Sequence, residues 1–246
     1  MNVDRYDTGC EPPWNRPGGS HPPPARWPTS GAADRRPTAA ALCQLVGSSS
    51  SRSSISTPSL CVGWRTAHVA GHLVFLAEGS PLRGSWYMWR YGHGVLVNRM
   101  IDATARRWAQ ATPTELADRL RAAADGRFRL PGAPPPAALA EVVVHGEDIR
   151  RPLGLPAPAR DGADLVPLLR FYRRIGRWFL HRGTRRMRLE ATDVDWAIGT
   201  GDLVRGPALA LLLALAGRHS ACDELERDGV TSLRQRSRDN RQVEPR

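Results

Sequence analysis

Apolar residues recur at spacings of three and four along much of the chain, which is the pattern of amphipathic helices. From Thr66 onward one such face carries Val69, His72, Leu73 and Leu76, and this helix is predicted to end near residues 79–84. The same pattern predicts helices at 95–109, 113–124, 137–151 and 164–182. Between the first two, residues 85–94 combine large aromatics with glycines, which favours a loop or a broken helix.

The pattern changes after residue 156. Residues 188–192 and 194–198 favour strands, followed by turn signals at Gly199 and Gly201. Pro207 suits the first turn of a helix and Gly217 suits its end, so a short apolar helix is predicted between them. A helix, two strands and a helix together predict a small α+β unit after an all-helical one.

Both ends of the chain lack hydrophobic periodicity. Residues 1–56 are rich in Pro, Gly, Arg and Ser and are predicted to be mostly disordered, with at most a short helix at 37–46. Residues 237–246 are predicted to form a disordered tail. The chain is therefore divided into a helical unit at 57–156 and an α+β unit at 157–236.

The basic charge is a weak guide to function. All 35 basic residues are arginine, against 24 acidic residues, which gives a net charge of +11. Arginine codons are GC-rich and lysine codons are not, so this usage points to a GC-rich coding sequence. The arginines are scattered apart from runs at 170–188 and after Arg227, and no nucleic-acid-binding motif accompanies them. Solvated helix faces are the preferred explanation, without a specific nucleic-acid partner.

The four cysteines lie far apart and form no Cys-x-x-Cys pair, which argues against a cysteine-rich zinc site and against a disulfide scaffold. The longest apolar run, at 208–216, is shorter than the roughly 20 residues that a bilayer requires. The N-terminus shows no pattern of a signal sequence. These features predict a cytoplasmic protein with no membrane partner.

Candidate chemistry lies on two of the predicted helices. Glu141 and His145 are four residues apart, so their side chains leave one helix on the same face. His72 lies among apolar residues of the helix that begins at Thr66. Two imidazoles and a carboxylate suit a catalytic divalent metal, because they leave positions open for water or substrate. The alternative is a structural histidine beside a solvated glutamate, but burying three polar groups is costly unless a cation satisfies them.

Three motifs point to a known family. The first is a Cys-x-Gly-Trp step at residues 61–64, followed by a helix with His72 and Leu73. The second is the run Glu-x-x-x-His-Gly-x-Asp-Ile-Arg-x-Pro-x-Gly at residues 141–154. The third is Arg-Gly-Pro at residues 205–207, which leads into an apolar helix ended by Gly217 and Arg218. Over roughly residues 57–236 the chain thus resembles the mycothiol-dependent maleylpyruvate isomerase family.

The resemblance implies an α+β fold in which a DinB-like four-helix bundle with a degenerate first helix covers 57–156, followed by a small α+β C-terminal domain. It implies metal ligands at His72, Glu141 and His145, with zinc as the typical metal and mycothiol as a soluble thiol cofactor. Four residues before the metal histidine the family usually has Asp. This chain has His68 there, which adds a candidate ligand.

The resemblance also places a catalytic arginine, near substrate or thiol, at Arg218. The alternative is an arginine at a helix C-terminus, which the helix dipole favours. Asp148 lies one turn after the second histidine, where it either orients a metal ligand or pairs with Arg150 or Arg151. Trp64 is interpreted as a core anchor.

The predicted function is that of a metal-dependent, mycothiol-using enzyme, an isomerase or S-transferase with a small-molecule substrate. A thiolate would add to a cis-unsaturated diacid, the new single bond would rotate, and elimination would give the trans isomer. One alternative is a catalytically silent metal-binding or regulatory protein of the same fold. Another is nucleic-acid binding through the arginine patches.

Overall fold

The computed structural model describes residues 55–78, 81–92, 97–122, 136–156, 160–175 and 184–239. The expectations for residues 1–54, including the short helix at 37–46, lie outside these ranges, as do those for 79–80, 93–96, 123–124, 176–182 and 240–246. In the part that is described, no helix is both long and apolar enough to cross a membrane.

The helices predicted from the 3.6-residue period are present in the first half of the chain. They are α3 (Thr66–Glu78), α5 (Val97–Trp108), α6 (Pro113–Ala122) and α7 (Pro136–Arg150). Helix α3 packs against the other three. The shared core is formed by apolar residues of α3, α6 and α7, among them Val69, Leu73, Leu116, Leu120 and Ile149.

Helix α3 lies unusually close to α5. A Cβ atom on Gly71 would come within 2.8 Å of the Ala105 carbonyl oxygen and 2.9 Å of the Ala109 backbone nitrogen. Glycine is therefore required for this crossing, because no other residue leaves the space. The neighbouring residue is His72, so the contact also sets where that imidazole lies.

The loop or broken helix expected at 85–94 is wrong for the residues described, because Pro81–Gly92 form helix α4. Aromatic contacts support this helix: Tyr87 meets Phe75 of α3 edge-to-face and stacks on Tyr91 one turn later. Gly84 and Gly92 weaken a helix without excluding it. The other face of α4 leaves Leu82, Trp86 and Trp89 exposed.

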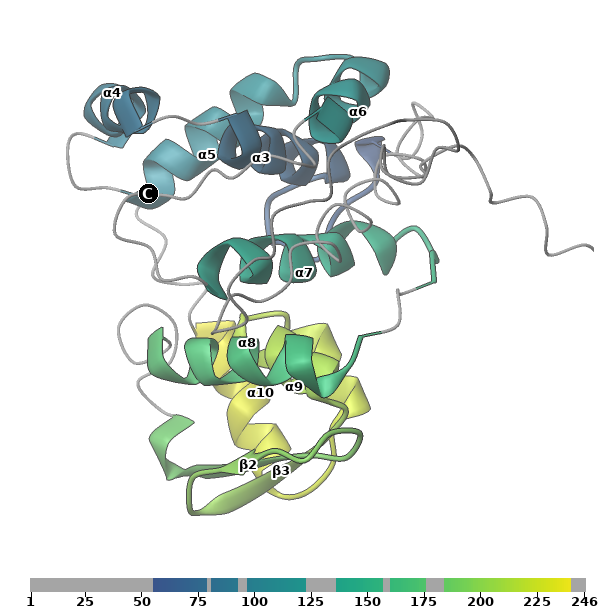
Figure 1. Cartoon of the computed structure of the whole chain (residues 1–246). Coiled ribbons are helices and arrows are strands. Elements are labelled where there is room, and N and C mark those ends of the chain that lie inside the picture. Colours follow the sequence, from purple (N-terminus) through teal and green to yellow (C-terminus); the bar gives the residue numbers. More distant parts are fainter. Residues whose placement is uncertain are drawn as a thin grey trace, which may run out of the picture.

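Helix α7 lies at the middle of the molecule, with α3, α5 and α6 above it and α8 and α9 below it in Figure 1. Residues Val142 to Arg150 of this helix are all buried. A helix buried all round is typical of the centre of a protein. Its polar side chains therefore need partners within the protein.

The second half contains α8 (Gly162–Ile175), a 3₁₀ turn η2 (Thr184–Arg186), β1 (Met187–Ala191), β2 (Ala197–Ile198), β3 (Asp202–Gly206), α9 (Ala208–Leu215), a 3₁₀ segment η3 (His219–Glu224) and α10 (Gly229–Asp239). The strand predicted at 194–198 is shorter than expected. Strand β3 and helix α10 were not predicted. Helix α10 also includes residues 237–239, which were expected to belong to a disordered tail.

The three strands form a mixed sheet in the order β2-β1-β3. Strand β1 pairs antiparallel with β2 and parallel with β3. Gly201 permits the turn into β3: its φ is +110°, and a Cβ atom would lie 2.1 Å from the Arg186 carbonyl oxygen. Arg205 of β3 forms a further bridge with Glu226.

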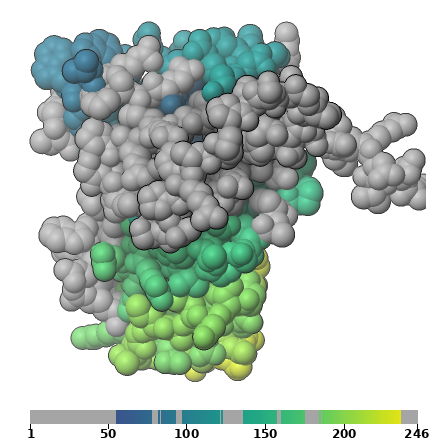
Figure 2. Space-filling model, in the orientation of Figure 1, coloured from purple at the N-terminus to yellow at the C-terminus, as the bar shows by residue number. Residues whose placement is uncertain are grey.

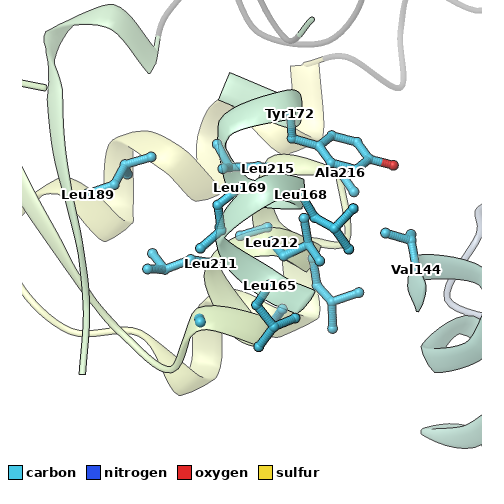
Figure 3. Close-up of a cluster of buried hydrophobic side chains, with 14 of the residues drawn as sticks. Val144, Leu165, Leu168, Leu169, Tyr172, Leu189, Leu211, Leu212, Leu215 and Ala216 are labelled. Atoms are coloured by element: carbon cyan, nitrogen blue, oxygen red, sulfur yellow. The ribbon is translucent and has the colours of Figure 1, made fainter. Parts of the chain in front are cut away.

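The main core of the second half lies between this sheet and α7. Leucines of α8 and α9 interdigitate there, with Leu189 of β1 on one side and Val144 of α7 on the other (Figure 3). In the space-filling view the elements of the second half, green to yellow, occupy one end, and helices of the first half occupy the other (Figure 2). A helical part followed by helices around a small sheet makes the fold α+β, as predicted.

Candidate metal centre

Three side chains that were predicted to act together meet between α3 and α7. His72 Nε2 lies 3.3 Å from Glu141 Oε2, and His145 Nε2 lies 3.1 Å from the same oxygen. One ligand atom from each residue falls within 4.8 Å of the others. Neighbouring ligands of a tetrahedral zinc ion, bonded at about 2.0 Å, are about 3.3 Å apart. The described residues thus bring the predicted trio together with separations that suit such an ion.

The local sequence explains how each group reaches this point. Glu141 and His145 are one turn apart on α7, so both side chains leave the same face. His72 lies on α3, which packs against α7. The two histidines are buried, at 3% and 8% exposure, whereas the Glu141 side chain is 38% exposed. The centre is therefore enclosed on the histidine side and open to solvent beside the carboxylate.

His68, the additional candidate ligand, is not part of this cluster. Its Nδ1 accepts a hydrogen bond of 3.0 Å from the backbone N–H of Arg65, the residue before α3. This is half of a capping box, in which a side chain at the third helical position satisfies a free N–H at the helix start. His68 therefore performs the capping that an acidic residue would perform there.

Asp148 contacts His145, and the arginine that pairs with Asp148 is neither Arg150 nor Arg151. Its Oδ2 accepts a hydrogen bond of 2.8 Å from His145 Nδ1, because a carboxylate can only accept. The same carboxylate forms an ion pair with Arg218, at 2.9 Å to Nε and 2.5 Å to Nη2. The alternative in which Asp148 orients a metal ligand agrees with these contacts, and pairing with Arg150 or Arg151 does not.

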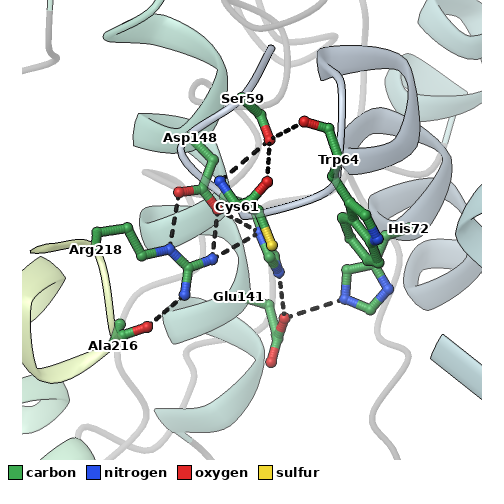
Figure 4. Close-up of polar contacts among 9 residues, drawn as sticks. Ser59, Cys61, Trp64, His72, Glu141, Asp148, Ala216 and Arg218 are labelled. Carbon is green, nitrogen blue, oxygen red and sulfur yellow. Dashed lines mark hydrogen bonds and ion pairs between the residues drawn. The ribbon is translucent and has the colours of Figure 1, made fainter. Parts of the chain in front are cut away.

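Arg218 reaches the centre from the side opposite to His72 (Figure 4). Its guanidinium is held by Asp148 and by the Ala216 carbonyl oxygen, which accepts from Nη1 at 2.5 Å. The side chain is 13% exposed. The catalytic role expected for this residue stays a prediction, since these contacts are with the protein itself.

Trp64 covers the centre from the loop before α3. Its ring lies 5.5 Å from the His72 ring and 6.2 Å from the His145 ring, measured between centroids. The indole Nε1–H donates a 2.9 Å hydrogen bond to Asp102 of α5. Trp64 was interpreted as a core anchor, but it also forms a wall of the site. Asp102 was not singled out from the sequence, which carries no local signal of this contact.

The charges around the trio set its protonation. Burial lowers the pKa of His72, and the nearby charges of His145 and Arg218 lower it further. Burial disfavours the charged forms of Glu141, His145 and Asp148, but the contacts of these groups have the larger effect on their pKa values. Hydrogen bonds from both histidines lower the pKa of Glu141, and those to Asp148 and Glu141 raise the pKa of His145 to about 9. The Arg218 charge lowers the pKa of Asp148 to about 2.

A cleft of about 420 Å³ lies beside Trp64. Its lining comes from residues 58–65 and from His219 and Ser220. The loop is tied down by Ser59 Oγ, which donates to the Trp64 carbonyl oxygen at 2.9 Å, and by the N–H of Leu60, which donates to the Asp148 carbonyl oxygen at 3.2 Å. The cleft thus joins the loop before α3 to the segment that follows Arg218.

The sequence matches no protein-family model and no curated protein. Two solved structures are similar to the chain. The crystal structure of the mycothiol-dependent maleylpyruvate isomerase has a TM-score of 0.52 and 16% identity, and the match covers 75% of this chain and 86% of that one. A histidine-to-alanine mutant of this enzyme has a TM-score of 0.53 and 15% identity, with 78% and 88% covered.

These matches confirm the resemblance predicted from the three motifs at the level of the fold. Both structures are of an enzyme, so this fold is one on which catalysis takes place. At this identity the likeness concerns architecture alone. The chain therefore has the fold of the mycothiol-dependent maleylpyruvate isomerase.

Proposed function

We propose that the chain is a divalent-metal-dependent enzyme of the maleylpyruvate isomerase type, which uses mycothiol as a soluble thiol. The observation that carries the proposal is the convergence of His72, Glu141 and His145 from two helices on one point. The fold shared with an enzyme of this activity supports it.

The trio fits a catalytic cation better than a purely structural role. His72 Nε2, Glu141 Oε2 and His145 Nε2 would hold the ion, and three protein ligands leave a position open for a substrate or thiol. The exposed side of Glu141 gives access to that position. When bound, the cation would supply Lewis acidity and would favour the thiolate over the thiol.

The residues around the trio would orient the ligands and exclude water. Asp148 accepts from His145 Nδ1, which leaves the Nε2 lone pair directed at the centre. The Trp64 ring shields both imidazoles on one side. The cleft of about 420 Å³ lies on the other side of Trp64, since none of the three ligands lines it, and it is the proposed place for the part of the thiol cofactor that is remote from the sulfur.

The reaction would need no redox partner. The thiol releases its proton to solvent, and the sulfur adds to one carbon of a cis-alkene conjugated to a carbonyl, whose oxygen receives the displaced electron pair. Rotation about the new single bond follows. The sulfur then leaves with its electrons, which restores the double bond in the trans form and regenerates the thiolate. A thiol transfer that stops after addition, with the carbon beside the carbonyl taking a proton from solvent, would use the same groups.

We propose that the cation is zinc. We also propose that the helices at 57–156 are organised as a DinB-like bundle and that the protein is located in the cytoplasm. A small unsaturated diacid and mycothiol are the proposed partners, without specific nucleic-acid or membrane binding. Two histidine nitrogens and one carboxylate oxygen form a donor set that zinc uses in catalytic sites.

Metal content tests the proposal directly. We expect wild-type protein to hold about one zinc ion per chain after dialysis, as measured by elemental analysis, and His72→Ala and Glu141→Ala to hold almost none. His68→Ala is the matched control, because it removes a histidine one turn away on the same helix that lies outside the cluster. Loss of zinc in the control, or none in wild type, would contradict the proposed centre.

The reaction is tested with zinc-loaded protein, mycothiol and a panel of cis-unsaturated diacids. Formation of the trans isomer without consumption of thiol indicates an isomerase, whereas loss of thiol indicates an S-transferase. Zinc binding without either reaction would remove the catalytic part of the proposal and leave a metal-binding protein.

A further inference from the structure

Arg218 is placed by the end of helix α9. Gly217 has a φ of +87°, its N–H donates to the Ala214 carbonyl oxygen, and the N–H of Arg218 donates to the Leu213 carbonyl oxygen. These two bonds form a Schellman motif, which ends a helix and turns the chain away from its axis. The turn directs the Arg218 side chain toward α7.

The guanidinium uses three of its five N–H donors in contacts with the protein. Nε donates to Asp148 Oδ1 at 2.9 Å and Nη2 to Oδ2 at 2.5 Å, which is the two-pronged geometry of a strong arginine–carboxylate pair. Nη1 donates to the Ala216 carbonyl oxygen. Each of the three guanidinium nitrogens thus has an acceptor from the protein.

Asp148 transmits this contact to the centre. Its side chain is fully buried, and Oδ2 accepts both from Arg218 and from His145 Nδ1. The chain of contacts therefore runs from the guanidinium through one carboxylate to one imidazole, whose other nitrogen faces Glu141. A carboxylate fixed in this way holds the imidazole ring in a single orientation.

We propose that Arg218 is a positioning residue that sets the metal affinity of the centre by holding Asp148 against His145. The inference rests on the proposed metal centre but not on mycothiol or on any particular substrate. It differs from a direct contact of the arginine with substrate. It also means that a residue following α9, in the α+β part, controls a centre whose ligands all lie on α3 and α7.

A double-mutant cycle measures this. Zinc dissociation constants are determined by competition with a chromogenic chelator for wild type, Arg218→Ala, Asp148→Asn and the double variant. Groups that orient a metal-bound histidine are typically worth about 10–100-fold in affinity. We expect a loss of this size for each single variant, and little further loss when Arg218→Ala is added to Asp148→Asn, because the two act through one contact.

Arg205→Ala is the matched control, since Arg205 belongs to the same part of the chain and pairs with Glu190 and Glu226 on the surface. It should leave zinc affinity unchanged. Arg218→Ala alone leaves a buried carboxylate without its cation and can impair folding. Asp148→Asn removes that charge, so the double variant keeps the comparison measurable.

The outcomes separate the two roles. An unchanged zinc affinity in Arg218→Ala, or fully additive losses in the double variant, would overturn the positioning role. The positioning role would also be overturned if Arg218→Ala bound zinc normally but bound a saturated diacid more weakly. That result is expected of an arginine that binds substrate. Wild-type protein that binds no zinc would overturn the proposed centre itself, and this inference with it.

Discussion

Replacing Gly71 by alanine tests whether the close crossing of α3 and α5 positions the centre. The added Cβ would lie 2.8 Å from the Ala105 carbonyl oxygen and 2.9 Å from both the Ala109 nitrogen and the Trp108 Cβ. The first two are backbone atoms, and the third is fixed to the backbone. None of them can rotate away, so α3 has to move from α5 by several tenths of an ångström.

The size of the effect follows from two opposing terms. Overpacking a tight contact costs about 1–3 kcal/mol. Alanine is favoured over glycine within a helix by about 1 kcal/mol. We therefore expect Gly71→Ala to lower the free energy of unfolding by up to about 2 kcal/mol. Zinc affinity should fall as well, because His72 moves with its neighbour.

The assay is urea denaturation followed by circular dichroism, together with zinc titration. Gly84→Ala is the control, since a Cβ there meets nothing within 4 Å and the residue lies in helix α4. It should raise the free energy of unfolding by up to about 1 kcal/mol and leave zinc affinity unchanged. If Gly71→Ala is as stable as Gly84→Ala and binds zinc normally, the crossing does not constrain the centre.

Three further results are expected. Zinc affinity should rise about tenfold for each pH unit up to about 9, because the pKa of His145 is raised to about 9 and the cation must displace that proton; affinity that is flat between pH 6.5 and 8 would contradict this. Wild-type protein should be about 2.7 kcal/mol more stable with free zinc at a hundred times its dissociation constant than after removal of zinc with a chelator. In thermal melts, His72→Ala should show no such difference. Asp193→Ala should cost about 1 kcal/mol in urea denaturation with zinc content unchanged, since Asp193 Oδ1 accepts a 2.8 Å hydrogen bond from the backbone N–H of Ala208 at the start of α9; an unchanged denaturation midpoint would show that this cap contributes nothing.

The helices that carry the trio could be predicted because their signals are local. The 3.6-residue period gave α3 and α7, and the spacing of Glu141 and His145 gave their common face. Helix α4 was missed because its glycines outweighed its aromatic contacts, which involve Phe75 on another helix. Strand β3 was missed because the few residues between the turn signal at Gly201 and the helix predicted from Pro207 were assigned to no element.

Contacts between distant parts of the chain could not be predicted. Arg218 and Asp148 are separated by 70 positions, and nothing in either local sequence selects this partner over Arg150 or Arg151. The contact between Trp64 and Asp102, which are 38 positions apart, could not be predicted for the same reason. For such pairs the sequence supplies the side chains and the packing of the elements decides which of them meet.

The polar run at residues 141–154 follows from the central position of α7. A helix that is buried on all sides can carry charge only where each group has a partner, because an unpaired buried charge is very costly. Glu141 and Asp148 meet histidines on one stripe of α7, while Glu147 on another meets Arg151 at 3.1 Å and Arg150 at 3.5 Å. Arg151 also pairs with Glu224 of η3. Glu141, His145 and Asp148 are therefore constrained by the proposed centre, and Glu147 and Arg151 by the contact between the two parts of the chain.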